Sequence, residues 1–548
     1  MLRKRRADAE KHRISTCKHN DRPASARMDR RKGFIKGRRP CDAFRLYVVA
    51  QKGQMSLAAK NCLCFGDSFA CCLPQPIQPV FTNTDYRQPA AHVRNAPFPC
   101  SYGGAVASAS AKAYKTPMLN QQTIQNQPDR RSACPGLSRM VMAKDGAIAR
   151  IKLRLGRLST QQALALADIA EHSGARAIEL SIRSNVQLRG IAPARWDEVV
   201  TALYEAGLGA DNPAADDIRN VMVSPTAGID PGQICDVTGL ASDLLAMLQA
   251  EKAFHALSPK FSLQVDGGED CAMISHPGDI WLSATEEGKA YVFGLTSSPD
   301  RQALGTIAAK NVLPFIDALL RCFLRHGAMR MKQLTSEREF VKTVRESLPF
   351  AIEPAYGWKR KATVAHAHLG QHRQLDRNHY IGAMPLLGRL TPLQLRELAR
   401  LAQDELRLTP WQGILLPNIA PGETDRIKRA LHATGLETSP KSAHARLRAC
   451  SGATGCASAL ADTQADGNFL AARLESGSDP VHLTGCAKSC AALAPLPHTL
   501  LARAAGRYDL YAQDRFSQNG AGPSRFGQLL ASDITLEEAA HILNARHR

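Results

Sequence analysis

The sequence predicts an α+β fold with two copies of one small unit, followed by a segment that carries four paired cysteines. Strand-like and helix-like segments follow one another in the order β-α-β-β-α between residues 147 and 206. A similar series starts again about 230 residues later. Cys450 and Cys456 then form one close pair and Cys486 and Cys490 another, in loops of Gly, Ala and Ser.

The first copy begins with a strand at 147–155, where apolar residues alternate. Ser159 has the side chain of an N-cap, and the helix that follows ends at Gly174. Strands at 177–182 and 185–191 come next, and a second helix spans 193–206. This order is that of a ferredoxin-like half-domain.

The second copy repeats the sequence as well as the plan. Gly156-Arg-Leu-Ser-Thr160 precedes the first helix, and Gly388-Arg-Leu-Thr-Pro392 precedes its counterpart, with Thr391 as N-cap. The strand at 411–419 corresponds to residues 183–191. Two copies of one half-domain predict pseudo-twofold symmetry, and a cleft between copies suits one large ligand.

The chain divides into six expected parts. They are a basic, disordered or artefactual extension (1–130), the first half-domain (131–207), a mixed domain (208–330), a connecting segment (331–380), the second half-domain (381–440) and a cysteine-bearing domain with a C-terminal helix (441–548). Thr535 and Glu538 have the spacing of a capping box at the start of that helix.

The net charge of +20 is concentrated at the N-terminus, where residues 1–40 hold 15 Lys or Arg and four Asp or Glu. This arm lacks apolar periodicity and interleaved aromatic residues, so we expect disorder, or a reading frame whose true start is an internal Met such as Met118. We expect no nucleic-acid partner.

The composition, 44% hydrophobic and 22% charged, is ordinary for an enzyme. No apolar run approaches 18 residues, so no membrane association is expected. The 15 cysteines come without a secretory signal, which favours a reducing, cytoplasmic compartment over a disulfide framework.

The four paired cysteines predict a [4Fe-4S] cluster, because such clusters take four thiolate ligands. Small residues in both loops let the backbone approach the cluster and aim N–H groups at its sulfurs. Zinc is the alternative. The gap between Cys486 and Cys490 suits zinc, whereas that between Cys450 and Cys456 is longer than zinc pairs usually have.

Arg183, Arg189, Arg219 and Lys260 are the candidate substrate-binding residues. Each lies in a strand-like or loop segment near Gly, Pro or Asn. Together they would suit a planar ligand with many carboxylates, because guanidinium binds carboxylate with a two-pronged fork. Any one of these four residues, taken alone, is more commonly an ordinary solvated cation. No Walker or dinucleotide-binding loop is present, so electrons are expected to come from a partner.

The cysteine pattern, the duplicated half-domains and Arg183-Ser-Asn-Val-Gln-Leu-Arg-Gly190 resemble the sulfite and nitrite reductase family over about residues 134–510. The resemblance implies a [4Fe-4S] cluster beside an iron tetrapyrrole, and it makes 208–330 the first copy of a reductase-type domain. It also implies that Arg183, Arg219 and Lys260 match basic catalytic residues.

The sequence departs from the reductases at three places. Ser262 stands where they carry a further Lys, Ala487-Lys488 where they usually have Pro-Asn, and Trp411 where the first copy has Arg183. These departures favour oxygenation of a tetrapyrrole with O2 over reduction of an oxyanion. The resemblance further implies that a mononuclear non-haem iron activates oxygen and that an external donor, an NADH-linked reductase or a ferredoxin, supplies electrons.

Two alternatives stay open. One is a sirohaem-dependent sulfite or nitrite reductase, the only case in which sirohaem is expected. The other is a non-catalytic iron–sulfur sensor whose basic arm binds nucleic acid.

Overall fold

The computed structural model describes residues 49–51, 54–56, 134–175, 177–492, 495–513 and 524–547, which fall into two units, Met1–Ala111 and Lys112–Arg548. In the first unit, β1 (Val49–Gln51) pairs antiparallel with β2 (Gln54–Ser56). The rest of the predicted extension, including its basic arm 1–40 and Met118, lies outside the described residues.

The second unit contains two ferredoxin-like sheets, in the strand orders β15-β6-β7-β4-β3 and β13-β14-β17-β16-β5. The strands of the first sheet are β3 (Val141–Ala143), β4 (Gly146–Ile151), β6 (Ala177–Leu180), β7 (Val186–Ile191) and β15 (Arg389–Leu390). Those of the second are β5 (Arg157–Ser159), β13 (Gly370–Arg373), β14 (His379–Ala383), β16 (Glu405–Leu408) and β17 (Ile414–Ile419). The helices are α1 (Thr160–His172) and α2 (Trp196–Glu205) in the first copy and α6 (Pro392–Leu401) and α7 (Thr424–Ala433) in the second.

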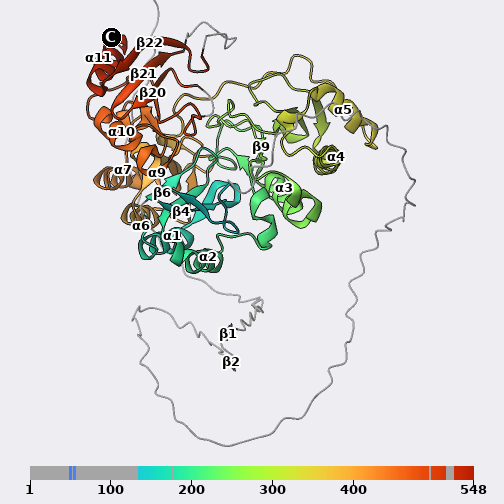
Figure 1. The fold of residues 1–548 in the computed structure, drawn as a ribbon. Helices are drawn as coiled ribbons and strands as arrows, with labels where there is room; N and C mark the ends of the chain where they lie inside the picture. Colours follow the sequence, from blue (N-terminus) through green and yellow to red (C-terminus); the bar gives the residue numbers. More distant parts are fainter. Residues whose placement is uncertain are drawn as a thin grey trace, which may run out of the picture. The chain divides into compact units, whose positions relative to one another are not determined.

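The two copies exchange one strand each. β5 belongs to the first copy by sequence but pairs with β16 of the second, and β15 of the second pairs with β6 of the first. Helices α1 and α6 pack together beside these strands (Figure 1). The copies therefore share one buried core, which joins side chains from both half-domains.

The corner before each exchanged strand has the same strained backbone. Leu155 and Gly156 have φ values of 52° and 71°, and Leu387 and Gly388 have 54° and 72°. Glycine is needed at 156 because a Cβ there would lie 2.9 Å from the Cβ of Ser184. The predicted N-caps Ser159 and Thr391 are confirmed, each in a capping box with the Gln three residues later.

Two flanking domains repeat one topology. One sheet has the order β12-β11-β10-β9-β8 and the other β18-β19-β20-β21-β22, with three parallel strands followed by two antiparallel ones in each. The first contains β8 (Val221–Val223), β9 (Leu263–Asp266), β10 (Ile280–Thr285), β11 (Ala290–Leu295), β12 (Gly305–Ala308), α3 (Thr238–Ala250), α4 (Val312–Arg325) and α5 (Glu337–Glu346). The second contains α8 (Ala443–Arg446), β18 (Leu447–Ala449), α9 (Gly452–Gly455), α10 (Thr463–Ala471), β19 (Val481–Thr484), β20 (His498–Ala504), β21 (Arg507–Ala512), β22 (Gln528–Ile534) and α11 (Leu536–His547).

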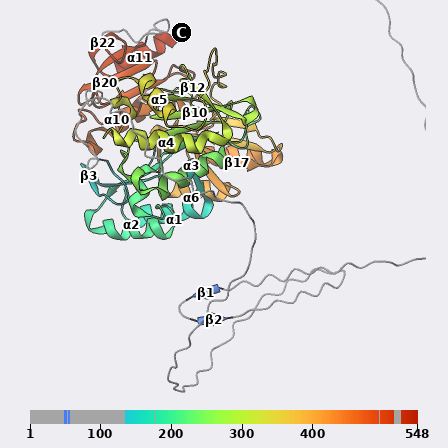
Figure 2. The same ribbon diagram turned by 90° about the vertical axis from the view of Figure 1, so that its right-hand side faces the viewer.

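Each half-domain inserts one leucine into a flanking core. Leu155 belongs to the core formed with α3 and α4, which pack against the first flanking sheet (Figure 2). Leu387 belongs to the core of the C-terminal domain. The duplication thus extends beyond the half-domains to the domains that flank them.

The boundary expected at residue 380 is wrong, because β13 lies inside the segment 331–380 and pairs with β14. The sequence signal of the second copy is the start of its helix near residue 392, and β13 precedes that signal in the chain. The capping box at Thr535 and Glu538 is confirmed. Among the described residues, no helix combines the length and apolar character needed to span a membrane.

Leu387→Ala is expected to lower the free energy of unfolding by about 2–5 kcal/mol, because it leaves a cavity where the side chain meets α10 beside Gly467. Leu393→Ala is the control, because Leu393 lies on the nearby α6 but is 64% exposed. Denaturant unfolding checks the difference. Equal losses in both variants would contradict the role given to this corner.

Candidate functional site

The four predicted cluster cysteines lie at one end of two neighbouring strands. Cys450 follows β18, and Cys486 and Cys490 follow β19, which is parallel to it. Parallel strands end at the same edge of a sheet, so both loops meet there. Cys456 directly follows the short helix α9 and completes the set.

The cysteine set suits a cluster. All four cysteines are free thiols, and their loops meet at one edge of the sheet. Four thiolates are the ligand set of a [4Fe-4S] cluster, and the gap between Cys450 and Cys456 is longer than zinc pairs usually have.

The loops are built for close approach to an inorganic core. The N–H of Gly485 donates to Cys450 Sγ at 3.2 Å, and a Cβ on Gly485 would lie 2.5 Å from that of Ala459. Burial, and then Cys486, Cys450 and Cys456, raise the pKa of the Cys490 thiol. Four thiolates therefore need a cationic centre to ionise together, and bound iron supplies one.

Arg183 lies in the turn before β7 and is half-buried. Burial, Arg330 and Arg150 lower the pKa of its guanidinium to about 10, against the opposing effect of Asp279. Arg330 is paired with Asp279 at 2.9 Å, whereas the partner of Arg150 in the described part of the chain is the neutral Gln187. The protein therefore places excess positive charge here, which attracts an anion.

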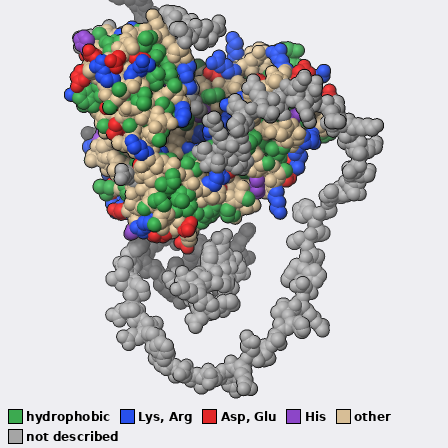
Figure 3. Space-filling model, in the orientation of Figure 1, with side chains coloured by type: hydrophobic (Ala, Val, Ile, Leu, Met, Phe, Trp, Pro, Cys, Tyr) green, Lys and Arg blue, Asp and Glu red, His purple; other side chains and the backbone are tan. Residues whose placement is uncertain are grey.

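The cluster loop lies near these cations. Burial lowers the pKa of Arg150, and Cys134, Glu179, Asp217 and the cluster thiol of Cys490 oppose that shift. Arg150 is therefore close enough to Cys490 to interact with it electrostatically. Figure 3 shows a hollow between the two flanking domains, with Lys and Arg side chains along its edge.

Arg189 does not face a substrate, contrary to the expectation from the sequence. Its side chain is 7% exposed and pairs with Asp145 at 2.9 Å. Its Nη2 also donates to the carbonyl of Gly455 at 2.7 Å. Because Nε and Nη2 of its guanidinium are engaged within the protein, Arg189 leaves the candidate substrate-binding set.

Arg219 belongs mainly to a buried polar network. It pairs with Asp216 at 3.7 Å and donates to the carbonyl of Lys152. Lys152 in turn is held by Asp216 and Asp217. Nη1 of Arg219, the nitrogen that faces Asp216 Oδ1 at 3.7 Å, makes no hydrogen bond among the described residues, so it stays open to a ligand.

Lys260 is exposed, and its side chain has no hydrogen bond or ion pair among the described residues. The chain around it is held by Asn220, which donates to the carbonyls of Pro259 and Phe261. Lys260 therefore lies on the segment next to Arg219 along the sheet edge, and it stays available to a ligand.

Sequence reasoning missed Arg150 and His276, and it marks Ser262 only as a departure from the reductases. The signal for Arg150 was a charged residue inside a strand whose other positions are almost all buried. His276 and Ser262 are 4% and 2% exposed, and among the described residues His276 Nε2 and Ser262 Oγ have no hydrogen-bond partner. Nothing in their local sequence indicates this, because the neighbours that enclose them are distant in the chain.

The first flanking domain has the same loops without the cysteines. Ser224 follows β8 as Cys450 follows β18, and Gly268 is the second residue after β9 as Cys486 is after β19. Ser224 Oγ donates to the carbonyl of Cys271 at 2.6 Å. Asp230 accepts from the N–H of Cys271 at 3.1 Å and from Thr226. In this domain, hydrogen-bonded side chains thus fill the position that corresponds to the cluster cysteines of the C-terminal domain.

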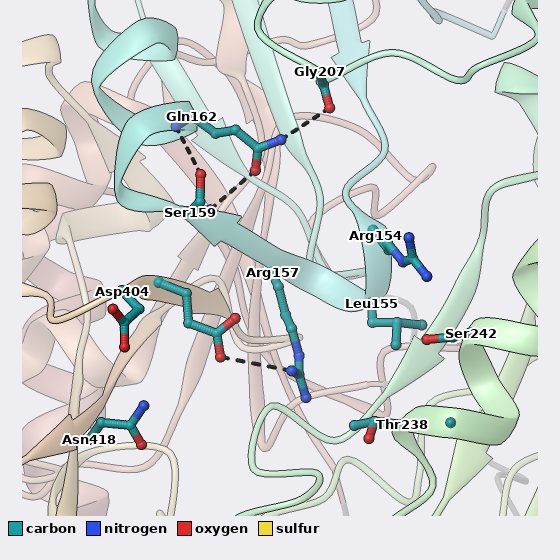
Figure 4. A pocket seen from close by; sticks show the side chains of 12 residues that line it. Arg154, Leu155, Arg157, Ser159, Gln162, Gly207, Thr238, Ser242, Asp404 and Asn418 are labelled. Carbon is teal, nitrogen blue, oxygen red and sulfur yellow. Dashed lines mark hydrogen bonds and ion pairs between the residues drawn. The ribbon is translucent and has the colours of Figure 1, made fainter. Parts of the chain in front are cut away.

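A cavity of about 830 Å³ lies apart from these groups (Figure 4). Its walls include Arg154, Thr238, Asp404 and Asn418, and Arg157 faces Glu405 across it at 3.9 Å. None of the cysteines or of the cations considered above lines it. The volume alone therefore does not mark the site.

His276→Gln is expected to flatten the pH dependence of stability between pH 6.5 and 4. Burial and Arg183 lower the pKa of His276 to about 4. Between pH 6.5 and 4 this histidine is protonated in the unfolded chain and neutral in the folded chain. The free energy of unfolding therefore decreases as the pH is lowered, by about 2 kcal/mol at pH 5. Denaturant unfolding at several pH values checks this, with exposed His541→Gln as control. Equal slopes in the two variants would refute it.

Known proteins match this arrangement. Residues 141–206 and 372–434 match the Nitrite/Sulfite reductase ferredoxin-like half domain. Residues 214–345 match the Nitrite and sulphite reductase 4Fe-4S domain, and this match falls on the flanking domain that lacks the cysteines. The duplicated ferredoxin-like half-domains expected from the sequence are confirmed.

Individual relatives agree. A precorrin-3B synthase from Sinorhizobium sp is 28% identical over 429 residues, 75% of this chain and 91% of the relative. A ferredoxin–nitrite reductase from Synechococcus elongatus is 28% identical over 381 residues, 63% of this chain and 73% of the relative. The NirA protein of Mycobacterium tuberculosis shares the fold, with a TM-score of 0.59, 20% identity, and coverage of 73% of this chain and 79% of that one. The chain belongs to the nitrite and sulfite reductase family and is an oxidoreductase with an iron–sulfur cluster site.

Proposed function

We propose that this protein is a precorrin-3B synthase, a monooxygenase of aerobic cobalamin biosynthesis. It would hydroxylate precorrin-3A with O2 at the junction of rings A and D, and the ring A acetate would then close a γ-lactone. The similarity to the Sinorhizobium synthase spans 91% of that protein, against 73% for the nitrite reductase. Local likeness to such synthases lies in Ala133-Cys-Pro-Gly136, Pro259-Lys-Phe-Ser262 and Gly485-Cys-Ala-Lys-Ser-Cys490.

The observation that carries the proposal is the excess positive charge beside the cluster loop. Arg150 interacts electrostatically with Cys490 and with Arg183, and among the described residues neither arginine forms a salt bridge with an acid. An acidic tetrapyrrole brings many carboxylates, which guanidinium groups bind in pairs of hydrogen bonds. Ser262 in place of a second lysine leaves less positive charge for a small oxyanion such as sulfite.

The chain's own residues would bind and orient the macrocycle. Arg183 and Lys260 are proposed to bind the carboxylates of the macrocycle. The structure adds Arg150 to this set, and Arg219 contributes its Nη1. His276 is neutral at physiological pH, because burial and Arg183 lower its pKa to about 4. It therefore offers a hydrogen bond without adding charge.

The reaction consumes O2, two electrons and two protons. One oxygen atom enters the macrocycle, and the other leaves as water. The cysteine-bound cluster supplies electrons one at a time when it is present. For a mononuclear non-haem iron, the described residues provide no group of three His, Cys, Asp or Glu ligands, so no step is assigned to it.

Electrons would come from an external donor, either a ferredoxin or an NADH-linked reductase. The cluster loop reaches the surface, where Ala487, Lys488 and Cys490 are exposed. Lys144 and Lys488 lie at this edge and donate to the loop residues Ala453 and Ser458. This positive edge suits an acidic donor protein. We place the reaction in the cytoplasm, where a thiolate cluster is kept reduced.

A sirohaem-dependent sulfite or nitrite reductase is the second candidate, because relatives with those names match most of the ordered chain. Absorption spectra separate the two. Purified protein with an intense Soret band from bound sirohaem would favour the reductase, and a broad iron–sulfur shoulder alone would favour the synthase.

An iron–sulfur sensor with a nucleic-acid-binding arm is the candidate of another class. Its arm lies outside the described residues. Deletion of residues 1–117 tests it: loss of nucleic-acid binding with unchanged oxygenase activity would make the arm functional.

The direct test begins with anaerobic purification, followed by iron and sulfide analysis. The protein is then incubated with precorrin-3A, a reductant and ¹⁸O2. We expect a product heavier by one labelled oxygen atom, detected by mass spectrometry, and none without O2. Turnover of sulfite or nitrite by the same preparation, with no oxygenated product, would overturn the proposal.

Arg183→Ala is expected to weaken tetrapyrrole binding about 10- to 100-fold, because a hydrogen bond between charged groups contributes about 1.5–3 kcal/mol. The absorption of the cluster should not change. Lys260→Ala should have a smaller effect, since that side chain is exposed. Arg195→Ala, which breaks a surface ion pair with Glu198, is the control. A parallel loss of cluster from Arg183→Ala would make Arg183 structural instead.

A further inference from the structure

The loop between the first two cluster cysteines is held by the first half-domain. Lys144 Nζ donates to the carbonyl of Ala453 at 2.8 Å, and Arg189 Nη2 donates to that of Gly455 at 2.7 Å. Ser451 Oγ lies 3.5 Å from Glu179 Oε1. Residues 451–455 are thus tied to strands more than 250 positions earlier in the chain.

Arg189 is the buried centre of these contacts. Its Nε and Nη2 donate to the two carboxylate oxygens of Asp145 at 3.1 and 2.9 Å. Asp145 is itself 9% exposed. Glu179 lies 3.6 Å from Arg189 and pairs with Arg389 of the second copy at 2.6 Å. The positive charges of Arg189 and Arg389 balance the negative charges of Asp145 and Glu179, so the guanidinium of Arg189 is held in one orientation.

Gly455 makes room for this guanidinium. A Cβ at Gly455 would lie 2.8 Å from Arg189 Nη2 and 3.2 Å from Asp145 Oδ2. The same Cβ would lie 3.3 Å from the Cβ of Ser451, and the backbone of Gly455 is not in the left-handed region, so the contact with Arg189 is the closest obstacle to alanine. The missing side chain therefore serves the approach of Arg189 to the loop.

We propose that Arg189 is a positioning residue that fixes the cluster loop 451–455, and with it the retention and the reduction potential of the cluster. Backbone N–H groups near a cluster tune its potential, and their direction depends on how the loop is held. Asp145 orients Arg189, and Gly455 receives it. The proposal requires only the cluster, so it holds whether the enzyme oxygenates a tetrapyrrole or reduces an oxyanion.

Arg189→Lys keeps the charge but cannot reach Asp145 and Gly455 together with one ammonium group. In the full-length holoprotein we expect iron release to a chelator to become about 10-fold faster. Amide hydrogen exchange in 451–455 should also speed up, and the midpoint potential from an EPR-monitored titration should shift. Arg195→Lys, at an exposed ion pair in the same half-domain, should change none of these.

Gly455→Ala supplies an independent test that leaves the arginine in place. It should release iron faster in the wild-type background, because the new methyl group displaces Arg189. In an Arg189→Ala background the same substitution should add little, because the clash is gone. Additive effects of the two substitutions, or unchanged iron release in Arg189→Lys, would overturn the proposal. Far-UV circular dichroism of each variant separates these results from general unfolding.

Discussion

The reciprocal exchange of β5 and β15 is the constraint on which the rest of the structure depends. Each half-domain completes its sheet with a strand from the other copy. Neither half can be folded alone without leaving an open sheet edge. The two strand-edge pairings also fix the corners at Leu155 and Leu387, which anchor the two flanking domains. One exchange therefore sets the arrangement of four structural parts.

Symmetry in the backbone coexists with asymmetry in the chemistry. Both flanking sheets end in a loop where cluster ligands fit by position, yet only the C-terminal domain has the two close cysteine pairs there. The other copy places Ser224 and a hydrogen-bonded Asp230 at that point. A similar division separates Arg183 from Trp411, which stacks on His368 at 4.1 Å. The first half-domain thus carries the candidate cation Arg183, whereas the C-terminal flanking domain carries the four cluster cysteines.

The site is assembled across these copies by strands β4 and β7 of the first half-domain. β4 carries Arg150 toward Cys490, and β7 runs from the turn of Arg183 to Arg189. The proposed substrate-binding cations Arg150 and Arg183 and the proposed clamp Arg189 therefore lie on or beside the same pair of hydrogen-bonded strands. This short element would connect the cluster loop to the proposed macrocycle site, which would suit electron transfer between them.

The sequence by itself determined the repeat and the helix starts, and it predicts the cluster ligands, because these depend on local spacing. Ser159 and Thr391 cap their helices through contacts only three residues away, and the cysteines lie in close pairs. The roles of the cations were decided by tertiary structure. Arg189 and Arg183 are six residues apart and read alike in the sequence. Asp145 and Gly455 engage Arg189, whereas no acid in the described part of the chain forms a salt bridge with Arg183. Whether a charge is free to bind a ligand depends on partners and burial from distant segments, and only the folded chain brings these together.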